Sequence, residues 1–515
     1  MKKLLSLLLV LCVLLCAGCF SNAPTSGTTT VPATTAPTVP ETTAPPINYA
    51  NSTVVLYTAN VRGDVTVYSQ IVAVRKAYEA LGATVYLVDA GNYLQGTAYA
   101  NADMGLTIYN LMDAAGYDVA GVGVYDLVHG EAEVGYAAHG DLTKFYTQAQ
   151  LFRGTAALRY RQNAAWAKEP VMATREAKAA AGFRVICSNL AAGEAATGYY
   201  NFDPYAVLSN GLVVGFVSSL PEDAAAYVQD DFLAGYTYQT VSAPACHVLV
   251  ALGGGEGDIV IEAPADGSLS VGAYIINQST AQVTFEPVTL SDSDPQMDAL
   301  IASLTPAQLL GTSSIMFTGS RQLSCNGQTQ LGTLVADALK WYAETYMEGI
   351  EYPVIGLFNG GNCRNFLYSG QITETDLRNA LHGSAKGMGV IYLTGAQLLE
   401  ALEAATQRED CPGWANVSGI DYLVDTEKAF DFGYAYGLYY KAASVNRVSI
   451  TTENFDPAAT YAVATDLLLL GGEDTYYLFK EQAIVARGET GLDTCAIVAR
   501  YIQEALGGQL GGDLA

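Results

Sequence analysis

The chain alternates between short apolar runs rich in β-branched residues and longer stretches whose apolar residues recur with the period of a helix. In its first part, the runs 54–57, 84–88 and 119–122 predict strands, whereas 68–81 and 106–115 predict helices. Strands and helices that alternate in this way are typical of a mixed α/β sheet. We therefore expect an α/β fold in this part of the chain.

The alternation continues beyond this first set. Further strands are predicted at 184–187, 212–217, 247–251 and 259–261. Residues 294–310, punctuated by Pro295 and Pro306, predict a connecting helix before a second α/β pattern starts near residue 314.

The second pattern also mixes both element types. Residues 331–347 and 394–405 predict helices, and 354–358 and 389–393 predict strands. Thr394 lies where the N-cap of a helix is expected, because its hydroxyl can accept a hydrogen bond from the first helical turn.

The first residues have a different character. Two lysines precede an apolar run at 4–15, and Cys16-Ala17-Gly18-Cys19 closes that run with small residues before a cysteine. The run is short for a membrane span, so the segment predicts a signal peptide that ends in a bacterial lipobox with a lipid on Cys19. Plain secretion is the alternative, since Cys16 stands where a lipobox usually has leucine. The Thr/Pro-rich residues that follow predict an extended stalk.

These patterns divide the chain into five parts. We expect a lipoprotein signal peptide at 1–19, a stalk at 20–47, a first domain at 48–290, a linker helix at 291–313 and a second domain at 314–515. Such a chain is predicted to lie outside the cytoplasm of a bacterium, attached to the cell membrane only through its lipid.

Charge and cysteine content bear on nucleic-acid binding, zinc binding and disulfide formation. The formal net charge of −26 argues against nucleic acid, because a polyanion would be repelled. The six cysteines after Cys19 form no C-x-x-C pair, so a zinc site is not indicated. One or two disulfides among them are compatible with the sequence, which does not assign them.

Several segments carry motifs whose order along the chain is informative. Residues 56–63 (LYTANVRG) resemble a strand followed by the motif N-D-x-H-G, and 89–97 (DAGNYLQGT) resemble D-x-G-D-x-x-Q-G-T. Residues 117–130 resemble a stretch that contains G-N-H-E, where this chain has GVYD at 123–126. In the second half, 330–338 (QLGTLVADA) resembles N-x-G-x-L-x-x-D-A, and 359–364 (NGGNCR) resembles N-G-G-G-I-R. Residues 413–419 (GWANVSG) resemble an aromatic segment, and 472–479 (GEDTYYLF) resemble G-G-D-G-Y/F-x-x-F.

Together these segments resemble the 5'-nucleotidase family of exported two-domain phosphoesterases. The resemblance implies an N-terminal calcineurin-like metallophosphoesterase sandwich (α/β/β/α) and a C-terminal 5'-nucleotidase-type α/β domain. It also implies two divalent metals, which activate a water and neutralise phosphoryl charge in such enzymes.

The positions of the expected metal ligands are occupied by other residues. The degenerate positions are Asn60, Arg62, Asn92, Val124, Tyr125, Asp126, Gly254, Pro264 and Asp266. No histidine falls on them, and two aspartates alone do not hold two metals, so we predict no metal cofactor. One hypothesis is that the Arg62 guanidinium fills part of the volume and charge left by the cations. The alternative is an unused site with Arg62 in solvent.

The second half keeps more of the family's motifs. Its candidate ligand-binding residues are Asn359, Gly361, Arg364, Trp414, Asp474 and Tyr476. By the resemblance, Asn359 and Arg364 contact a nucleotide, and Trp414 and Tyr476 clamp its base; aromatics packed in the core are the alternative. Relatives carry an arginine near 325–327 where this chain has Cys-Asn-Gly, which leaves Arg321 as the nearest. This favours a nucleoside or base over a nucleotide.

Three functions remain open from the sequence. The first is a binding protein for a nucleoside or nucleotide that descends from the enzyme and has lost hydrolysis. The second is a working phosphoesterase of extracellular nucleotides, and the third is a structural surface lipoprotein. Loss of the metal ligands favours a pseudoenzyme over the hydrolase, because neither the water nor the phosphoryl charge has another evident stabiliser. Residues 131–180 have no counterpart in the family, and an insertion over the old metal cleft is one interpretation of them.

Overall fold

The computed structural model describes residues 47–511 except for 104, 129–142, 146–156, 163–164, 167–170, 173–182, 193–201, 229–232, 234, 382–386 and 437–438. The chain divides into two compact units, Met1–Ile47 and Asn48–Ala515. Cys19, the signal peptide and the stalk precede the described residues. Most of 131–180 also lies outside them, apart from four short strands: β4 (Thr143–Phe145), β5 (Ala157–Gln162), β6 (Ala165–Trp166) and β7 (Val171–Met172).

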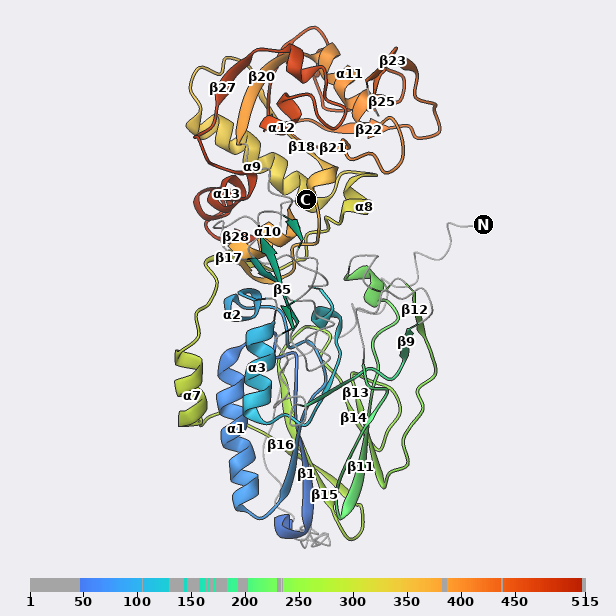
Figure 1. Cartoon of the computed structure of the whole chain (residues 1–515), viewed down its shortest axis with the longest axis vertical. Helices are drawn as coiled ribbons and strands as arrows, with labels where there is room; N and C mark the ends of the chain where they lie inside the picture. The colour runs from blue at the N-terminus through green and yellow to red at the C-terminus, as the bar shows by residue number, and fades with distance from the viewer. Residues whose placement is uncertain are drawn as a thin grey trace, which may run out of the picture. The chain divides into compact units, whose positions relative to one another are not determined.

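A six-stranded mixed sheet forms the centre of the N-terminal half (Figure 1). Its order is β16 (Val283–Pro287), β15 (Ser270–Asn277), β1 (Ser52–Ala59), β2 (Thr84–Asp89), β3 (Val119–Gly121) and β8 (Arg184–Ile186). Strands β1, β2, β3 and β8 run parallel, and the β15–β16 hairpin pairs antiparallel with β1. The predicted strands are confirmed, whereas the hairpin was not predicted.

Strand β1 shows how this sheet is covered on both faces. Val54 and Leu56 pack into one core with helices α1 (Val65–Ala80) and α3 (Leu106–Ala115). Val55 and Tyr57 point the other way, into a core shared with a second sheet. That sheet contains β10 (Ala206–Asn210), β11 (Leu212–Ser218), β13 (Val248–Leu252) and β14 (Ile259–Ile261). The predicted α/β sandwich is confirmed, with a helical layer and two sheets in its described part.

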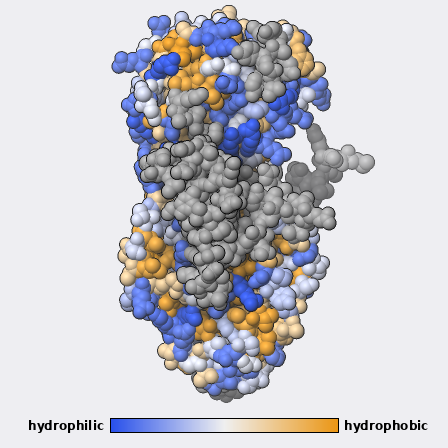
Figure 2. Space-filling model, viewed as in Figure 1, coloured by the Kyte–Doolittle hydropathy of each residue, from blue (hydrophilic) through white to orange (hydrophobic). Residues whose placement is uncertain are grey.

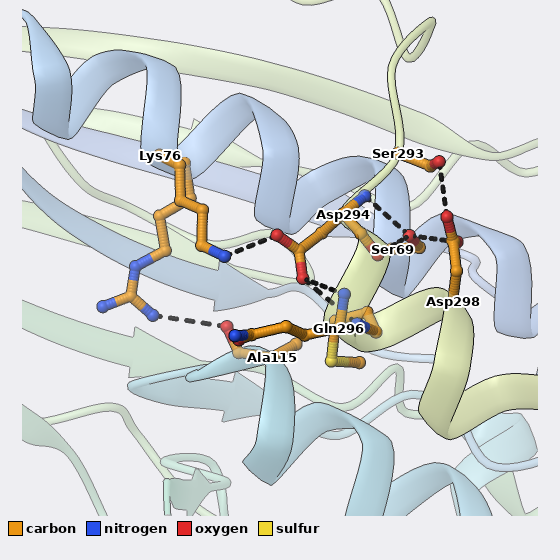
Figure 3. Close-up of polar contacts among 9 residues, drawn as sticks. Ser69, Lys76, Ala115, Ser293, Asp294, Gln296 and Asp298 are labelled. Carbon is orange, nitrogen blue, oxygen red and sulfur yellow. Dashed lines mark hydrogen bonds and ion pairs between the residues drawn. The ribbon is translucent and has the colours of Figure 1, made fainter.

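The connecting helix is shorter than the sequence predicted. Helix α7 (Pro295–Ala302) ends eight residues before the predicted end at residue 310, and strand β17 (Leu309–Ser313) follows, so the prediction for the last part of 294–310 was wrong. Asp294 caps α7 by accepting from the backbone N–H groups of Gln296 and Met297. The same carboxylate pairs with Lys76 of α1 at 2.5 Å, and Ser69 of α1 donates to Asp298 (Figure 3). These polar contacts fix α7 against α1.

The C-terminal half contains a five-stranded sheet and a three-stranded sheet. The larger has the order β21 (Ala415–Ser418), β18 (Val354–Asn359), β26 (Thr460–Asp466), β20 (Met388–Thr394) and β27 (Ile484–Arg487). The smaller has the order β19 (Gly370–Thr373), β17 and β28 (Gln509–Leu510). Helices α9 (Gln330–Tyr346) and α11 (Gly395–Ala405) contact the larger sheet. Thr394 caps α11 in a capping box with Gln397, which confirms the predicted helix start.

The remaining α-helices and strands are short. The helices are α2 (Ala98–Asn101), α8 (Arg321–Ser324), α10 (Glu374–Ala380), α12 (Leu467–Leu470) and α13 (Thr494–Arg500). The strands are β9 (Leu190–Ala192), β12 (Tyr236–Tyr238), β22 (Tyr422–Val424), β23 (Phe432–Tyr436), β24 (Tyr439–Ala442) and β25 (Val448–Ile450).

A segment of the C-terminal half reaches the core of the N-terminal half. Phe366 and Tyr368 pack into the same apolar cluster as α1 and α3. The buried Asn365 donates its side-chain N–H to the carbonyl of Val128 at 3.1 Å. Residues on either side of the predicted domain boundary therefore share one hydrophobic cluster.

The coloured part of the face drawn in Figure 2 is mixed rather than uniformly apolar. On the face drawn in Figure 2, hydrophobic residues form separate patches among hydrophilic ones. Within the described residues, no helix combines the length and apolar character needed to cross a bilayer.

Candidate functional site

A cavity of about 600 Å³ opens where strands of both N-terminal sheets end. The loops that follow β1, β2, β3, β11, β13 and β14 all contribute to its wall, as expected for the carboxyl edge of an α/β sheet. The degenerate positions that line it are Asn60, Arg62, Asn92, Val124, Tyr125, Pro264 and Asp266. Asp126 lies behind the wall, fully buried, and Gly253 lines the cavity instead of Gly254.

Two asparagines form the centre of this wall. The Asn92 side chain donates from Nδ2 to Oδ1 of Asn60 at 2.9 Å, and its own Oδ1 accepts from the backbone N–H of Tyr125 at 3.0 Å. Asn60 in turn donates to the carbonyls of Pro264 at 2.8 Å and Ser268 at 3.1 Å. Each amide therefore presents its donor and its acceptor to protein atoms, and we call this set of bonds the amide chain.

A glycine makes room for the amide chain. A Cβ placed on Gly123 would lie 2.1 Å from Oδ1 of Asn92, which is far inside van der Waals contact. Asn60 and Asn92 both hold left-handed backbone, with φ of 57° and 65°, a conformation that asparagine tolerates better than most residues. The loops are therefore shaped around these two amides.

Arg62 lies over Tyr125, with its guanidinium carbon 3.8 Å from the ring centroid. Its Nη2 donates to Oε1 of Gln95 at 2.7 Å and to the carbonyl of Ser369 at 3.1 Å. Burial lowers the pKa of Arg62, whereas Tyr125 and Asp126 act in the opposite direction. The side chain is thus held by the protein and is not extended into solvent.

Asp126 anchors the loops behind the cavity. Its two oxygens accept four backbone N–H groups, from Asn92, Tyr93, Leu94 and Gly123, at 2.7 to 2.9 Å. Burial raises the pKa of Asp126 to about 6, although these four donors favour the carboxylate. The residue therefore organises backbone and does not face a ligand.

The residues of the cavity do not fit two divalent cations. The oxygens of Asn60 and Asn92 already accept N–H groups, and the cationic Arg62 lies in the same wall. Asp223, Glu262 and Asp266 line the cavity, yet no group of three or more acidic, histidine or cysteine side chains suited to a metal occurs in the described part of the chain. His247 accepts a backbone N–H from Val213, and the other three histidines lie outside the described residues.

A second candidate site lies in the C-terminal half, in the loop after β18. Asn359 is buried and donates to the carboxylate of Asp474 at 2.5 Å, while its Oδ1 accepts from Asn362 at 2.8 Å. Gly361 packs so closely on Pro412 that an added Cβ would lie 2.8 Å from it. The predicted residues Asn359, Gly361 and Asp474 therefore meet in one place.

Two arginines converge on the same carbonyl of this loop. Both Arg321 and Arg364 donate from Nη1 to the oxygen of Gly361, Arg321 at 2.7 Å. Burial lowers the pKa of Arg364, and the nearby positive charge of Arg321 lowers it further. Arg321, which the sequence left as the arginine nearest to 325–327, thus supplies a second guanidinium beside Arg364. We call Arg321, Asn359, Gly361, Arg364 and Asp474 the arginine loop site.

The two aromatic residues of the predicted clamp are packed in the core. Trp414 is 6% exposed and Tyr476 is 0% exposed, and the Tyr476 hydroxyl donates to the carbonyl of Gly413 at 2.6 Å. Tyr476 also contacts Phe479, with ring centroids 4.8 Å apart. An open clamp is therefore not formed in this structure, which has the core packing that was the alternative. The physical reason is that the apolar rings gain more from burial than from exposure on a loop.

Sequence reasoning missed three contacts that shape these sites. Gln95 and Ser369 hold Arg62, and Arg321 joins Arg364. Gln95 stands in the quoted D-x-G-D-x-x-Q-G-T segment, which could have indicated it. Ser369 and Arg321 contact residues distant in sequence, and no local pattern marks such pairs.

A comparison with known protein families gives a match in the C-terminal half of the chain. Residues 309–481 match the model of the 5'-nucleotidase, C-terminal domain. A search of curated proteins finds no significant match.

Solved structures similar to this chain include two nucleotidases. The 5'-nucleotidase precursor from Thermus thermophilus is 17% identical, with a TM-score of 0.40, and the match covers 89% of this chain and 97% of that protein. The NAD nucleotidase of Haemophilus influenzae is 12% identical, with a TM-score of 0.36, and the match covers 89% of this chain and 97% of that protein.

At these identities and TM-scores, the assignment rests on the family match and not on the structural likeness. The match lies in the half of the chain that holds the arginine loop site. The predicted resemblance is therefore confirmed, because residues 309–481 match the C-terminal domain of the 5'-nucleotidase family.

Proposed function

We propose that this chain binds a nucleotide-like small molecule at the arginine loop site and does not hydrolyse it by a two-metal mechanism. The observation that carries the binding part is the convergence of Arg321 and Arg364 on the carbonyl of Gly361. Two neighbouring guanidiniums repel each other and gain from an anion that lies between them. A phosphate-bearing ligand supplies that anion, so we favour a nucleotide over the nucleoside indicated by the sequence.

The loss of hydrolysis is supported by the amide chain. A two-metal hydrolase needs oxygen and imidazole ligands whose lone pairs are open to the cations. Here the amide oxygens accept N–H groups from the protein, and Arg62 adds a positive charge to the same wall. We therefore propose that the N-terminal half is a degenerate phosphoesterase domain.

The test pairs ligand binding with turnover on the full chain, purified in detergent. Thermal unfolding is measured with AMP, adenosine and inorganic phosphate, and release of phosphate from AMP is measured with added Mn²⁺ or Zn²⁺. We expect the unfolding temperature to rise with AMP more than with adenosine, and no metal-dependent release of phosphate. Metal-dependent turnover supports the hydrolase alternative and overturns the proposal.

Matched arginine variants locate the binding site. Arg321→Gln and Arg364→Gln each remove one guanidinium, and we expect each to weaken AMP binding by about tenfold or more. Arg500→Gln is the control, because Arg500 pairs with Glu489 at the surface. If AMP, adenosine and phosphate all leave the unfolding temperature unchanged, the structural lipoprotein is the better description.

We further propose that the chain is exported and held at the bacterial membrane by a lipid on Cys19. The support is the lysine-apolar-cysteine order of its first residues. Cells that express the chain are labelled with a radioactive fatty acid. We expect label in the wild-type chain and none in Cys19→Ser; equal labelling of both would contradict the anchor.

A further inference from the structure

Three cysteines meet beside the arginine loop site. Cys325 caps the end of α8, Cys363 follows the loop after β18, and Cys411 precedes Pro412. They are 2%, 0% and 0% exposed, and all three are present as free thiols.

Cys325 and Cys411 lie on two segments that are joined by one backbone hydrogen bond and two side-chain hydrogen bonds. The backbone N–H of Cys411 donates to the carbonyl of Cys325 at 3.1 Å. Next to them, Asn326 donates to the carboxylate of Asp410 at 2.7 Å, and the backbone N–H of Asp410 donates back to Oδ1 of Asn326 at 2.9 Å. Three hydrogen bonds thus hold the two cysteines side by side.

The backbone hydrogen bond brings Cys325 and Cys411 close to one another. Disulfides join residues whose Cα atoms lie about 4.4 to 6.8 Å apart, so two cysteines that are linked by a backbone hydrogen bond are candidates for a disulfide. Cys363, in contrast, belongs to the apolar cluster with Phe317 and Leu331, and its thiol lies beside the hydroxyls of Ser324 and Thr329.

We propose that Cys325 and Cys411 are the site of an intramolecular disulfide, with Cys363 remaining a thiol. The oxidant is a disulfide, either a small molecule or a thiol–disulfide oxidoreductase. The Cys325 thiolate attacks one sulfur of the oxidant, forms a mixed disulfide and releases one thiolate. The Cys411 sulfur then attacks Sγ of Cys325, and the second thiolate leaves. The two protein thiols lose their protons to the two released thiolates, so the oxidant ends as two thiols.

The surroundings favour Cys325 as the first nucleophile. Burial raises the pKa of Cys325; the positive charges of Arg321 and Arg364 lower it, and the negative charges of Asp410 and Asp474 raise it. Burial raises the pKa of Cys411 to about 11, and the backbone N–H of Gly413 opposes this shift. Because both thiols are buried, the exchange takes place while the chain folds or when these loops open.

The bond would connect the walls of the arginine loop site. Arg321 belongs to α8, directly before Cys325, and the carbonyls of Pro412 and Trp414 accept from the N–H groups of Gly361 and Gly360. A covalent link between Cys325 and Cys411 therefore restrains the loop of Gly361 from two sides. This restraint is independent of which ligand the loop takes.

Peptide mapping of the full chain tests the proposal. The chain is unfolded, refolded in reduced and oxidised glutathione, treated with an alkylating agent, digested without reductant and analysed by mass spectrometry. We expect one linked peptide pair that contains Cys325 and Cys411, with Cys363 alkylated. Recovery of Cys325 in alkylated form, or joined to another cysteine, would overturn the proposal.

Two variants keep the result decisive. Cys363→Ser is expected to give the same linked pair, and Cys325→Ser is expected to return Cys411 to the alkylated pool. If Cys325→Ser does not fold, the wild-type and Cys363→Ser maps decide alone. As a second measurement, the oxidised chain is expected to unfold at a higher temperature than the same chain kept in a reducing agent; equal temperatures count against the link.

Discussion

Asn92 donates its side-chain N–H to Oδ1 of Asn60 at 2.9 Å, across the ends of two neighbouring strands. Family motifs place aspartates at both positions, and two aspartates so close would repel each other unless cations lay between them. Two amides instead complement each other, since each offers both a donor and an acceptor. With asparagine in place of aspartate at both positions, the two loops can pack together without a bound ion.

The amide pair predicts the effect of restoring the acids. Asn60→Asp combined with Asn92→Asp is expected to lower the free energy of unfolding by about 2 kcal/mol or more at pH 7, because like charges meet and donors to Pro264 and Ser268 are lost. Urea unfolding in the presence of a chelator measures this.

Asn277→Asp is the matched control for that experiment. The Asn277 oxygen accepts from the N–H groups of Ser279 and Thr280, which an aspartate oxygen at the same place also accepts, so the change should stay within about 0.5 kcal/mol. A double variant as stable as the wild type would show that the amide chain does not support these loops.

Even a conservative replacement of Arg62 is expected to destabilise the folded chain. A lysine cannot reach Gln95 and Ser369 together while covering the Tyr125 ring, so Arg62→Lys should lower the free energy of unfolding by about 2 kcal/mol. The measurement is again urea unfolding. Arg500→Lys, a change at an exposed ion pair, should have little effect. Equal stability of Arg62→Lys and the wild type would favour a solvent-facing Arg62.

Asp126 predicts a definite dependence of stability on pH. Its pKa is raised to about 6 in the folded chain from 3.8, so the folded state binds its proton more tightly than the unfolded state. The proton on Asp126 therefore stabilises the folded state fully below about pH 4. This stabilisation is lost as the pH rises through about 6, and the free energy of unfolding then falls by roughly 3 kcal/mol for a pKa shift of this size.

The variant Asp126→Asn isolates that dependence. It removes the titration and turns an amide N–H toward backbone donors, so it should be less stable than the wild type at every pH. The difference in free energy of unfolding between the two chains should shrink as the pH is raised from 4 to 7. A difference that stays constant or grows would contradict the raised pKa.

Tyr476 tests whether the second aromatic belongs to the core or to the ligand. Tyr476→Phe keeps the ring but removes the hydroxyl that donates to Gly413, so it should cost about 1 kcal/mol of stability. The rise in unfolding temperature caused by AMP should not change. Tyr352→Phe, at an exposed ring, serves as the control. If Tyr476→Phe loses the response to AMP and Tyr352→Phe keeps it, the predicted aromatic clamp is supported.

The fold was largely predictable because local patterns determine most of it. The strand prediction at 259–261 coincides with β14, and Thr394 caps α11 as expected. Helix α1 begins at Val65, before the predicted residue 68, because Asp64 caps it by accepting from Thr66. The β15–β16 hairpin was missed: β15 has a short apolar run at 273–276, but β16 is largely exposed and has no such run.

The sites were predictable only in part. Motif order correctly indicated which loops line the cavity, because strand ends in such sheets converge. Burial of Tyr476 and the meeting of Arg321 with Arg364 depend on contacts between distant segments, which a single sequence does not encode locally. The predicted division into five parts, the anchor and the ligand contacts stay predictions.

Asn60, Arg62 and Asn92 all hold left-handed backbone in one wall of the N-terminal cavity, and their side-chain hydrogen bonds end on other protein atoms. Such a wall is preorganised, so a molecule that enters the cavity does not have to order these loops first. Its selectivity would then depend on shape and charge alone. Chelating agents, which dismantle sites built around ions, should leave this wall intact.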